Sequence, residues 1–157
     1  AKGGAQSVHA VDISQDAVQL AEANARRNGL RDRMSFQAAN VFDLLPQLAE
    51  QKNLFDFVIL DPPAFTKSRS TVDHAVKGYK EINLRAMKML PEGGFLVTCS
   101  CSQHVSRQAF EDMLLSAARD AHRLVRVVEA RTQGRDHPVL LAAPETQYLK
   151  FFVLQVF

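Results

Sequence analysis

The sequence lacks the features that mark membrane, secreted and polybasic proteins. No apolar run approaches the roughly 20 residues that a helix needs to cross a bilayer. The first residues, Ala-Lys-Gly-Gly-Ala-Gln, do not have the character of a signal peptide. The net charge is only +2, which argues against a chain that binds nucleic acid through its overall charge. We therefore expect a cytoplasmic protein with no membrane partner.

Cysteine is also scarce, with only two residues, Cys99 and Cys101, in the sequence Cys-Ser-Cys. Both would lie on one side of an expected strand, about 6.6 Å apart at the usual rise per residue. That separation is near the upper limit for a disulfide, and parallel side chains fit the bond poorly. A chain of this size with two cysteines is not a secreted disulfide scaffold. We expect both cysteines to be thiols in a reducing compartment.

The composition is that of a folded domain. Hydrophobic residues make up 46% and charged residues 23% of the 157 residues, which excludes a disordered chain. Basic residues gather in two local clusters, for which a solvated helix face is the simpler interpretation; for the arginine cluster a nucleic-acid contact is equally well supported. These clusters are Arg26, Arg27, Arg31 and Arg33, and Lys67, Arg69, Lys77 and Lys80.

Short β-rich runs alternate with helical patterns along the chain. One helix is expected to begin after Ser14 and end at Gly29, and another to begin after Ser106, because serine is a favoured N-cap and glycine a favoured helix terminator. Two further helical stretches cover 42–51 and the segment that leads to Leu90. The expected strands are 7–13, 34–39, 55–60, 95–100, 124–130 and 148–157.

This order predicts an α/β fold with a mostly parallel sheet, right-handed crossovers and helices on both faces. The run 55–60 is almost entirely apolar, as expected for a central strand. The last two strands have no helix between them and predict an antiparallel edge. A Rossmann-like sheet that ends in this way is typical of class I S-adenosylmethionine-dependent methyltransferases. Gly3-Gly4 follows no strand of its own, so we expect residues 1–157 to be a partial domain that lacks the first strand and its Gly-rich turn.

Polar residues follow the first two expected strands. Asp12 ends the first, where a carboxylate can accept hydrogen bonds from ribose hydroxyls, but it also suits a helix N-terminus. Asn40 ends the second, where its amide can recognise an adenine edge or simply form a turn. Residue type alone leaves both choices open for Asp12 and favours the turn for Asn40.

The segment Asp61-Pro62-Pro63-Ala64-Phe65 ends the apolar strand abruptly, because prolines cannot continue the hydrogen-bond ladder. It predicts a rigid loop that presents a carboxylate and backbone carbonyls at the ligand edge of the sheet. Phe65 can stack on a base there, which is worth about 1–3 kcal/mol. The structural alternative is a proline-terminated strand with a packed phenylalanine, and we favour the functional interpretation because such a strand has little need of the acid.

Cys101 lies just beyond the next strand, where its thiolate would be a candidate nucleophile at the same edge as Asp61. Cys99 lies deeper in the strand and is interpreted as a buried apolar cysteine. These two cysteines and His104 lack an evident fourth ligand, so no metal site is expected. Asp136-His137-Pro138 precedes the last strand and is either a turn or a base or RNA contact; residue type does not decide.

Three motifs follow one another in a family-specific order. They are Asp61-Pro-Pro-Ala-Phe, Gly78-Tyr79-Lys80-Glu81-Ile82-Asn83 and Gly93-Gly94-Phe-Leu-Val-Thr-Cys-Ser-Cys-Ser102. Together with Asp136-His-Pro-Val, Pro144-Glu145 and Tyr148-Leu-Lys150, they resemble the bacterial ribosomal RNA large subunit methyltransferase I family. The resemblance covers essentially the whole chain. It implies an enzyme that forms 5-methylcytosine in 23S rRNA with S-adenosylmethionine as the cofactor.

The resemblance also implies roles for individual residues. Asp12 would bind the cofactor ribose, Asn40 and Val41 its adenine, and Asp61 would lie beside the transferred methyl group. Cys101 matches the nucleophile of the family's Ser-Cys-Ser motif. Ile13 completes the expected cofactor contacts, and the expected substrate contacts are Pro62, Pro63, Phe65 and Lys67.

The sequence departs from the family in several respects. Asn40 stands where aspartate is common, and Ala64 where lysine is common, so any contact of that lysine is lost. The N-terminal RNA-binding PUA domain and the Gly-rich first motif of the family are absent, so we expect weak or no cofactor binding by residues 1–157 alone. An exposed sheet edge would also invite pairing with another chain, and a homodimer is left open.

Two other functions remain open. A methyltransferase that acts on an exocyclic or ring nitrogen of an RNA base could use the Asp-Pro-Pro-aromatic loop without any cysteine. A domain that is inactive by itself and only binds RNA is the other alternative.

Overall fold

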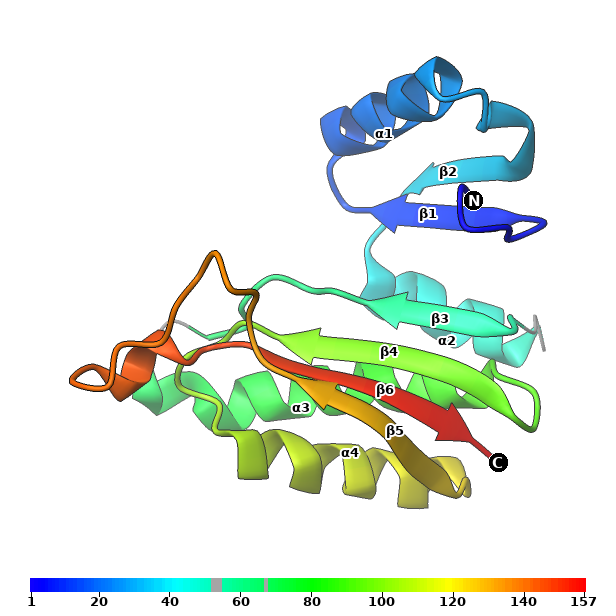
Figure 1. Cartoon of the computed structure of the whole chain (residues 1–157). Helices are drawn as coiled ribbons and strands as arrows, with labels where there is room; N and C mark the ends of the chain where they lie inside the picture. Colours follow the sequence, from blue (N-terminus) through cyan, green and yellow to red (C-terminus); the bar gives the residue numbers. More distant parts are fainter. Residues whose placement is uncertain (52–54, 67) are drawn as a thin grey trace. The chain divides into compact units, whose positions relative to one another are not determined.

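The computed structural model describes residues 1–51, 55–66 and 68–157 (Figure 1). These residues form two compact units, Ala1–Gln47 and Leu48–Phe157. Lys67, an expected substrate contact, lies outside the described residues. Among the described helices, none is both long and apolar enough to cross a membrane.

The first unit is a parallel β-α-β arrangement. Strands β1 (Val8–Asp12) and β2 (Met34–Ala38) pair in parallel and are connected through helix α1 (Gln15–Arg27). Ser14 caps α1 as predicted, since its hydroxyl accepts a hydrogen bond from the Ala17 backbone N–H at 3.3 Å. The chain then leaves the helix through Gly29, whose φ of +65° glycine adopts without strain. Helix α2 (Val41–Glu50) begins at the end of this unit.

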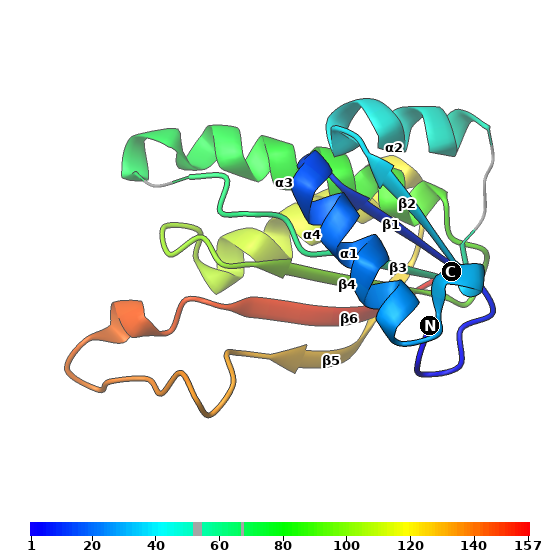
Figure 2. The same ribbon diagram turned by 90° about the horizontal axis from the view of Figure 1, so that it is seen from above.

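The second unit is a four-stranded mixed sheet in the order β3-β4-β6-β5 (Figure 2). Strands β3 (Phe57–Leu60) and β4 (Gly94–Ser100) are parallel. Strand β6 (Lys150–Val156) lies antiparallel between β4 and β5 (Val125–Arg131). The predicted antiparallel ending of a mostly parallel fold is therefore confirmed, with β5 as the edge strand.

Helices α3 (Val72–Lys88) and α4 (Arg107–Ala121) pack together on one face of this sheet. The ring of Phe110 in α4 lies 5.5 Å from that of Tyr79 in α3 and 5.9 Å from that of Phe152 in β6. Ser106 caps α4 through a 3.1 Å bond from the Ala109 N–H. The apolar residues that recur at helical spacing along α4 are all buried, namely Phe110, Met113, Leu114, Ala117, Ala118 and Ala121.

The expectation that 55–60 forms a central strand covered on both faces is wrong for the second unit. Strand β3 begins only at Phe57 and pairs with β4 alone among the described strands. Phe57 and Ile59 are 50% and 65% exposed, whereas Leu60 is buried. The reason is that both helices of the β-α-β-α segment, α3 and α4, pack on the same face of the sheet.

Candidate active site

The carboxyl ends of β1 and β2 bring two polar residues to one edge of the first unit. Asp12 pairs with Ala38 in the parallel register, and its carbonyl accepts a hydrogen bond from the Ala39 N–H at 2.9 Å. Asn40 follows directly and precedes α2. Because parallel strands end on the same side, Asp12 and Asn40 both stand at the edge where α/β sheets bind ligands.

Both side chains also hold their own backbone. Oδ1 of Asp12 accepts a hydrogen bond from the Ser14 N–H at 2.8 Å, and Oδ1 of Asn40 accepts one from the Phe42 N–H at 3.1 Å. The structural roles that the sequence allowed are therefore real. Each bond uses one oxygen, and both side chains are exposed, so the second carboxylate oxygen of Asp12 and the Asn40 amide group remain accessible to a ligand.

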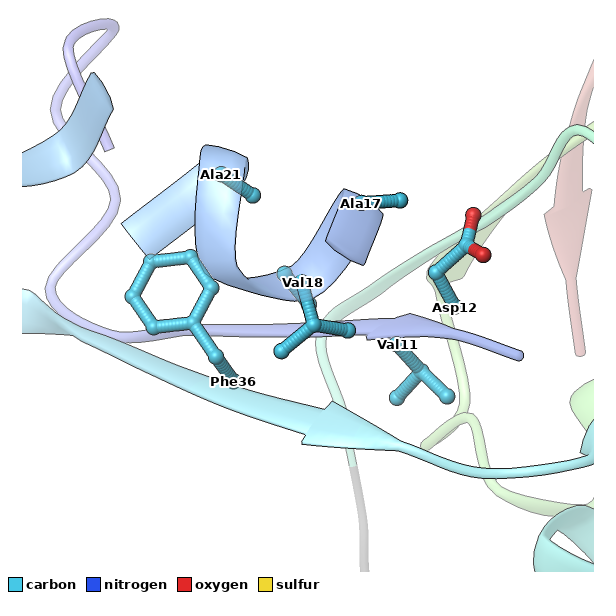
Figure 3. Close-up of a pocket in the computed structure, with 7 residues that line it drawn as sticks. Val11, Asp12, Ala17, Val18, Ala21 and Phe36 are labelled. Carbon is cyan, nitrogen blue, oxygen red and sulfur yellow. The ribbon is translucent and has the colours of Figure 1, made fainter. Parts of the chain in front are cut away.

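A small cavity of about 180 Å³ opens beside Asp12, beneath α1 (Figure 3). Figure 3 shows the Asp12 carboxylate at one end of the cavity and the Phe36 ring at the other. Next along the chain, Ile13 is 75% exposed, and Val41 is half-buried at the start of α2. The cavity is lined by Ala10, Val11, Asp12, Ala17, Val18, Ala21 and Phe36.

The second unit has an equivalent edge. Asp61 follows β3 and Cys101 follows β4, and the two strands are parallel with Leu60 opposite Thr98. The two residues that the sequence singled out for chemistry therefore stand at the ends of neighbouring strands. Asp61 is exposed and Cys101 is half-buried, and both cysteines are free thiols, as predicted.

Cys99 in β4 is hydrogen-bonded to the end of the neighbouring strand β3. It is buried as predicted, but it is more than an apolar filler, because its Sγ donates hydrogen bonds to Oδ1 of Asp61 at 3.0 Å and to the Leu60 carbonyl at 3.4 Å. Burial, together with the adjacent Asp61 carboxylate, raises the pKa of the Cys99 thiol to about 12. Cys99 is thus a neutral donor that orients Asp61, and Cys101 is the cysteine accessible to a substrate.

Tyr79 joins the loops that carry these residues. Its side chain is fully buried, and its hydroxyl lies 2.9 Å from the Ser102 hydroxyl and accepts a long hydrogen bond, 3.5 Å, from the Phe65 N–H. The rings of Phe65 and Tyr79 lie 4.5 Å apart. The loop after β3 and the loop after β4 therefore share one anchor. The remaining loop residues with expected substrate roles are Pro62, half-buried, and Pro63, exposed.

The sequence and fold of this chain were compared with those of known proteins. A family model described as a methyltransferase domain matches residues 1–143. The chain belongs to the methyltransferase domain family.

Curated relatives of this methyltransferase domain carry the name ribosomal RNA large subunit methyltransferase I. The relative from Shewanella frigidimarina is 42% identical over 157 residues, which is 99% of this chain and 40% of the relative. The relative from Photobacterium profundum is 44% identical over 156 residues, 99% of this chain and 39% of the relative. These matches confirm the resemblance seen in the motifs. The chain spans about two fifths of the length of these relatives.

Solved structures agree on the fold. The structure of SMU.776 complexed with SAH has a TM-score of 0.84 at 20% identity, covering 98% of this chain and 40% of that one. The SAM-dependent methyltransferase from Agrobacterium tumefaciens has a TM-score of 0.66 at 17% identity, covering 99% and 49%. The predicted methyltransferase fold is confirmed.

The methyltransferase domain contains a buried lysine, Lys150, which was noted in the sequence only as part of the motif Tyr148-Leu-Lys150 and without a predicted role. Lys150 opens β6 and is only 6% exposed, and its Nζ donates hydrogen bonds to the carbonyls of Ser102 at 2.5 Å and Tyr148 at 2.8 Å. Burial lowers its pKa to about 8, an effect that the neighbouring Cys101 partly opposes. The signal was available, because Lys150 shares its strand face with Phe152, Leu154 and Val156, all of them core residues.

Asp136 and His137 are exposed neighbours in the methyltransferase domain, with Nδ1 of His137 3.2 Å from Oδ2 of Asp136. The His137 ring also lies edge-on to that of Tyr148, with the centroids 6.5 Å apart. Throughout 1–51, 55–66 and 68–157, the structure shows no group of three or more histidine, cysteine or acidic residues that could hold a metal ion.

Proposed function

We propose that this methyltransferase domain transfers a methyl group from S-adenosylmethionine to C5 of a cytosine in 23S rRNA, with Cys101 as the nucleophile. The main support is the position of Cys101, which follows β4 and is only half-buried. The neighbouring strand β3 is followed by Asp61, whose carboxylate accepts a hydrogen bond from Cys99. The names of the curated relatives support the ribosomal RNA substrate. We also propose that residues 1–157 form part of the catalytic domain of a longer enzyme.

The residues of the first unit fit the nucleoside part of the cofactor. The Ser14 N–H fixes one oxygen of Asp12 and leaves the other exposed to accept hydrogen bonds from ribose hydroxyls. Asn40 is likewise fixed by the Phe42 N–H, and the second lone pair of its Oδ1 can accept a hydrogen bond from the adenine amine. Ile13 and Val41 are the proposed apolar contacts of the adenine. S-adenosylmethionine, when bound, supplies a methyl group on a positively charged sulfur.

The protein has to activate the base, because C5 of cytosine is a poor nucleophile. Attack of the Cys101 thiolate on C6 forms a carbon–sulfur bond and moves the C5=C6 π electrons onto C5, which can then accept the methyl group. The electrons of the methyl–sulfur bond stay on the sulfur, so that S-adenosylhomocysteine is the leaving group. A base then removes the C5 proton, and the electrons of that C–H bond restore C5=C6 and expel the thiolate. We assign Asp61 as the polar group beside the base that serves this proton transfer.

The target cytosine has to leave its stack to reach Cys101. The loop of Pro62, Pro63 and Phe65 is the proposed contact surface for the flipped base, with Lys67 as a phosphate contact. Phe65 packs on the buried Tyr79, which gives the loop a rigid support, and rigidity lowers the entropy lost on binding.

The test uses the full-length protein, unmodified 23S rRNA and labelled S-adenosylmethionine, followed by mass spectrometry of the nucleosides. We expect 5-methylcytosine from the wild type and none from Cys101→Ala. Cys99→Ala is the matched comparison two residues away, and we expect it to retain reduced activity because it keeps the nucleophile. RNA that carries 5-fluorocytosine should trap the adduct on Cys101, because fluorine cannot leave as a proton.

Other outcomes would assign other functions. Methylation of a nitrogen, with Cys101→Ala as active as the wild type, would replace the C5 mechanism by chemistry centred on the Asp61-Pro62-Pro63 loop. RNA binding by the full-length protein without any methylation would leave only the RNA-binding alternative.

A further inference from the structure

Lys150 is a buried cation that lacks an acidic partner. None of the ion pairs found among the described residues includes Lys150, and its ammonium group instead contacts two backbone carbonyls. The two carbonyls accept two of the three hydrogens of the ammonium group but do not neutralise its charge. A buried charge without a counter-ion is expensive, so its persistence calls for an anion nearby.

Lys150 is linked to the residues on both sides of Cys101 in the sequence. In the β4–β6 ladder Lys150 stands opposite Ser100, the residue before Cys101. Its Nζ donates to the carbonyl of Ser102, the residue after Cys101. The lysine is thus held on both sides of the nucleophile by backbone geometry, and the charge of the Cys101 thiolate acts on Lys150 in the direction that favours the ammonium form.

We infer that Lys150 is a positioning residue for the nucleophile: its ammonium group is the counter-charge of the Cys101 thiolate, and its bond to Ser102 fixes the turn that presents the sulfur. This inference rests on the proposed function, because it gives Cys101 a reactive thiolate. A half-buried thiol ionises unfavourably without a nearby positive charge, and lysine supplies such a charge at many reactive cysteines. Two other described cations of the second unit are engaged elsewhere, since Arg107 lies over Phe152 and Lys80 pairs with Asp120.

Neither Cys99 nor Asp61 can supply a positive charge to Cys101. Cys99 stays protonated because its pKa is raised to about 12, and Asp61, its hydrogen-bond partner, is an acid that would oppose ionisation of a thiol. His104 lies three residues further along the same loop and is half-buried. A His104→Gln variant therefore belongs in the experiment as a control for a second source of positive charge.

The experiment measures the alkylation rate of Cys101 by iodoacetamide against pH in the full-length protein, with the modified peptide quantified by mass spectrometry. The variants are Lys150→Met, which keeps the length but not the charge, and Lys150→Arg, which keeps the charge. We expect Lys150→Met to move the midpoint of the profile up by about one pH unit and to slow alkylation at neutral pH about tenfold. Lys150→Arg and His104→Gln should keep the wild-type midpoint.

A reciprocal measurement keeps Lys150 in place, in case its variants do not fold. The titration of Lys150 is followed by NMR of lysine labelled at Cε, in the wild type and in Cys101→Ala. We expect the Lys150 midpoint to fall when the thiolate is removed. An unchanged midpoint there, or a Lys150→Met alkylation profile that matches the wild type, would overturn the inference. A coupled Lys150–Cys101 pair in a protein that methylates no cytosine would instead refute only the proposed function.

Discussion

The Sγ atom of Cys99 donates a hydrogen bond to Oδ1 of Asp61 across 3.0 Å, from the penultimate residue of β4 to the residue that follows β3. The same S–H hydrogen is shared with the Leu60 carbonyl, whose oxygen lies 3.4 Å from Sγ. One donor thus fixes both the backbone and the side chain at the point where β3 ends. The orientation of Asp61 is set from inside the sheet.

Removing this donor should impair catalysis without removing the nucleophile. We expect Cys99→Ala to lower kcat/KM on ribosomal RNA about tenfold, since a hydrogen bond to a charged group contributes about 1.5–3 kcal/mol. Cys99→Ser should recover most of the loss, because its hydroxyl also donates. Steady-state kinetics of the two variants against the wild type is the measurement, and equal activity of Cys99→Ala and wild type would show that Asp61 needs no such support.

The Tyr79 hydroxyl should contribute to stability through the two loops that it joins. Tyr79→Phe leaves the fully buried Ser102 hydroxyl without this partner, and we expect a loss of about 1–3 kcal/mol in the free energy of unfolding. Tyr148→Phe is the matched control at the only other tyrosine, where a change within about 0.5 kcal/mol is expected. Urea unfolding of both variants decides, and similar midpoints for the two would contradict the anchor role.

Lys150 should make stability depend on pH in a defined direction. Its pKa is about 8 in the folded protein, below the ordinary value of 10.5, so the unfolded chain binds more protons between these values. The free energy of unfolding contributed by this group therefore rises as the pH increases from about 8 to 10.5. We expect wild type to gain stability relative to Lys150→Met over that range. Urea unfolding at several pH values measures this difference, and a difference that stays constant or narrows would contradict the assignment.

Asp12 should control cofactor affinity through its exposed oxygen. In the full-length protein we expect Asp12→Ala to weaken binding of S-adenosylhomocysteine about tenfold or more, which corresponds to loss of a charge-assisted hydrogen bond. Asp16→Ala, which removes an exposed acid from the first turn of α1, is the control and should bind as the wild type does. Isothermal titration calorimetry measures the affinity of both variants. Equal losses of affinity would show that the two acids act only through their charge near the helix N-terminus.

Local signals in the sequence predicted most of the elements. Ser14 and Ser106 cap helices as expected, because capping depends on a few neighbouring residues. The apolar residues of α4 are buried because their 3.6-residue period places them on one face of the helix. The prediction that both faces of β3 are buried was wrong. An apolar strand does not encode which face its crossover helices choose, and that choice leaves Ile59 exposed.

The candidate site was predicted in part for the same reason. The positions of Asp12, Asn40, Asp61 and Cys101 at strand ends were predicted because strand ends can be located in a sequence, while their functional roles stay predictions. The Cys99–Asp61 bond was not found, since it depends on the register between two strands. The contact of Lys150 with Ser102 joins residues 48 positions apart and follows only from the antiparallel ladder.

The strand order β3-β4-β6-β5 also bears on the order of assembly during synthesis. Strand β5 leaves the ribosome before β6, yet β6 is its only partner among the described strands and separates it from β4. The edge strand must therefore wait, unpaired, for a segment that is made later. The same late segment brings Lys150 to the turn after β4. A nascent chain that stalls before residue 150 would hold Cys101 and Asp61 but have neither a completed sheet nor the lysine beside its nucleophile, so maturation of the second unit and of its reactive thiol would be a single event.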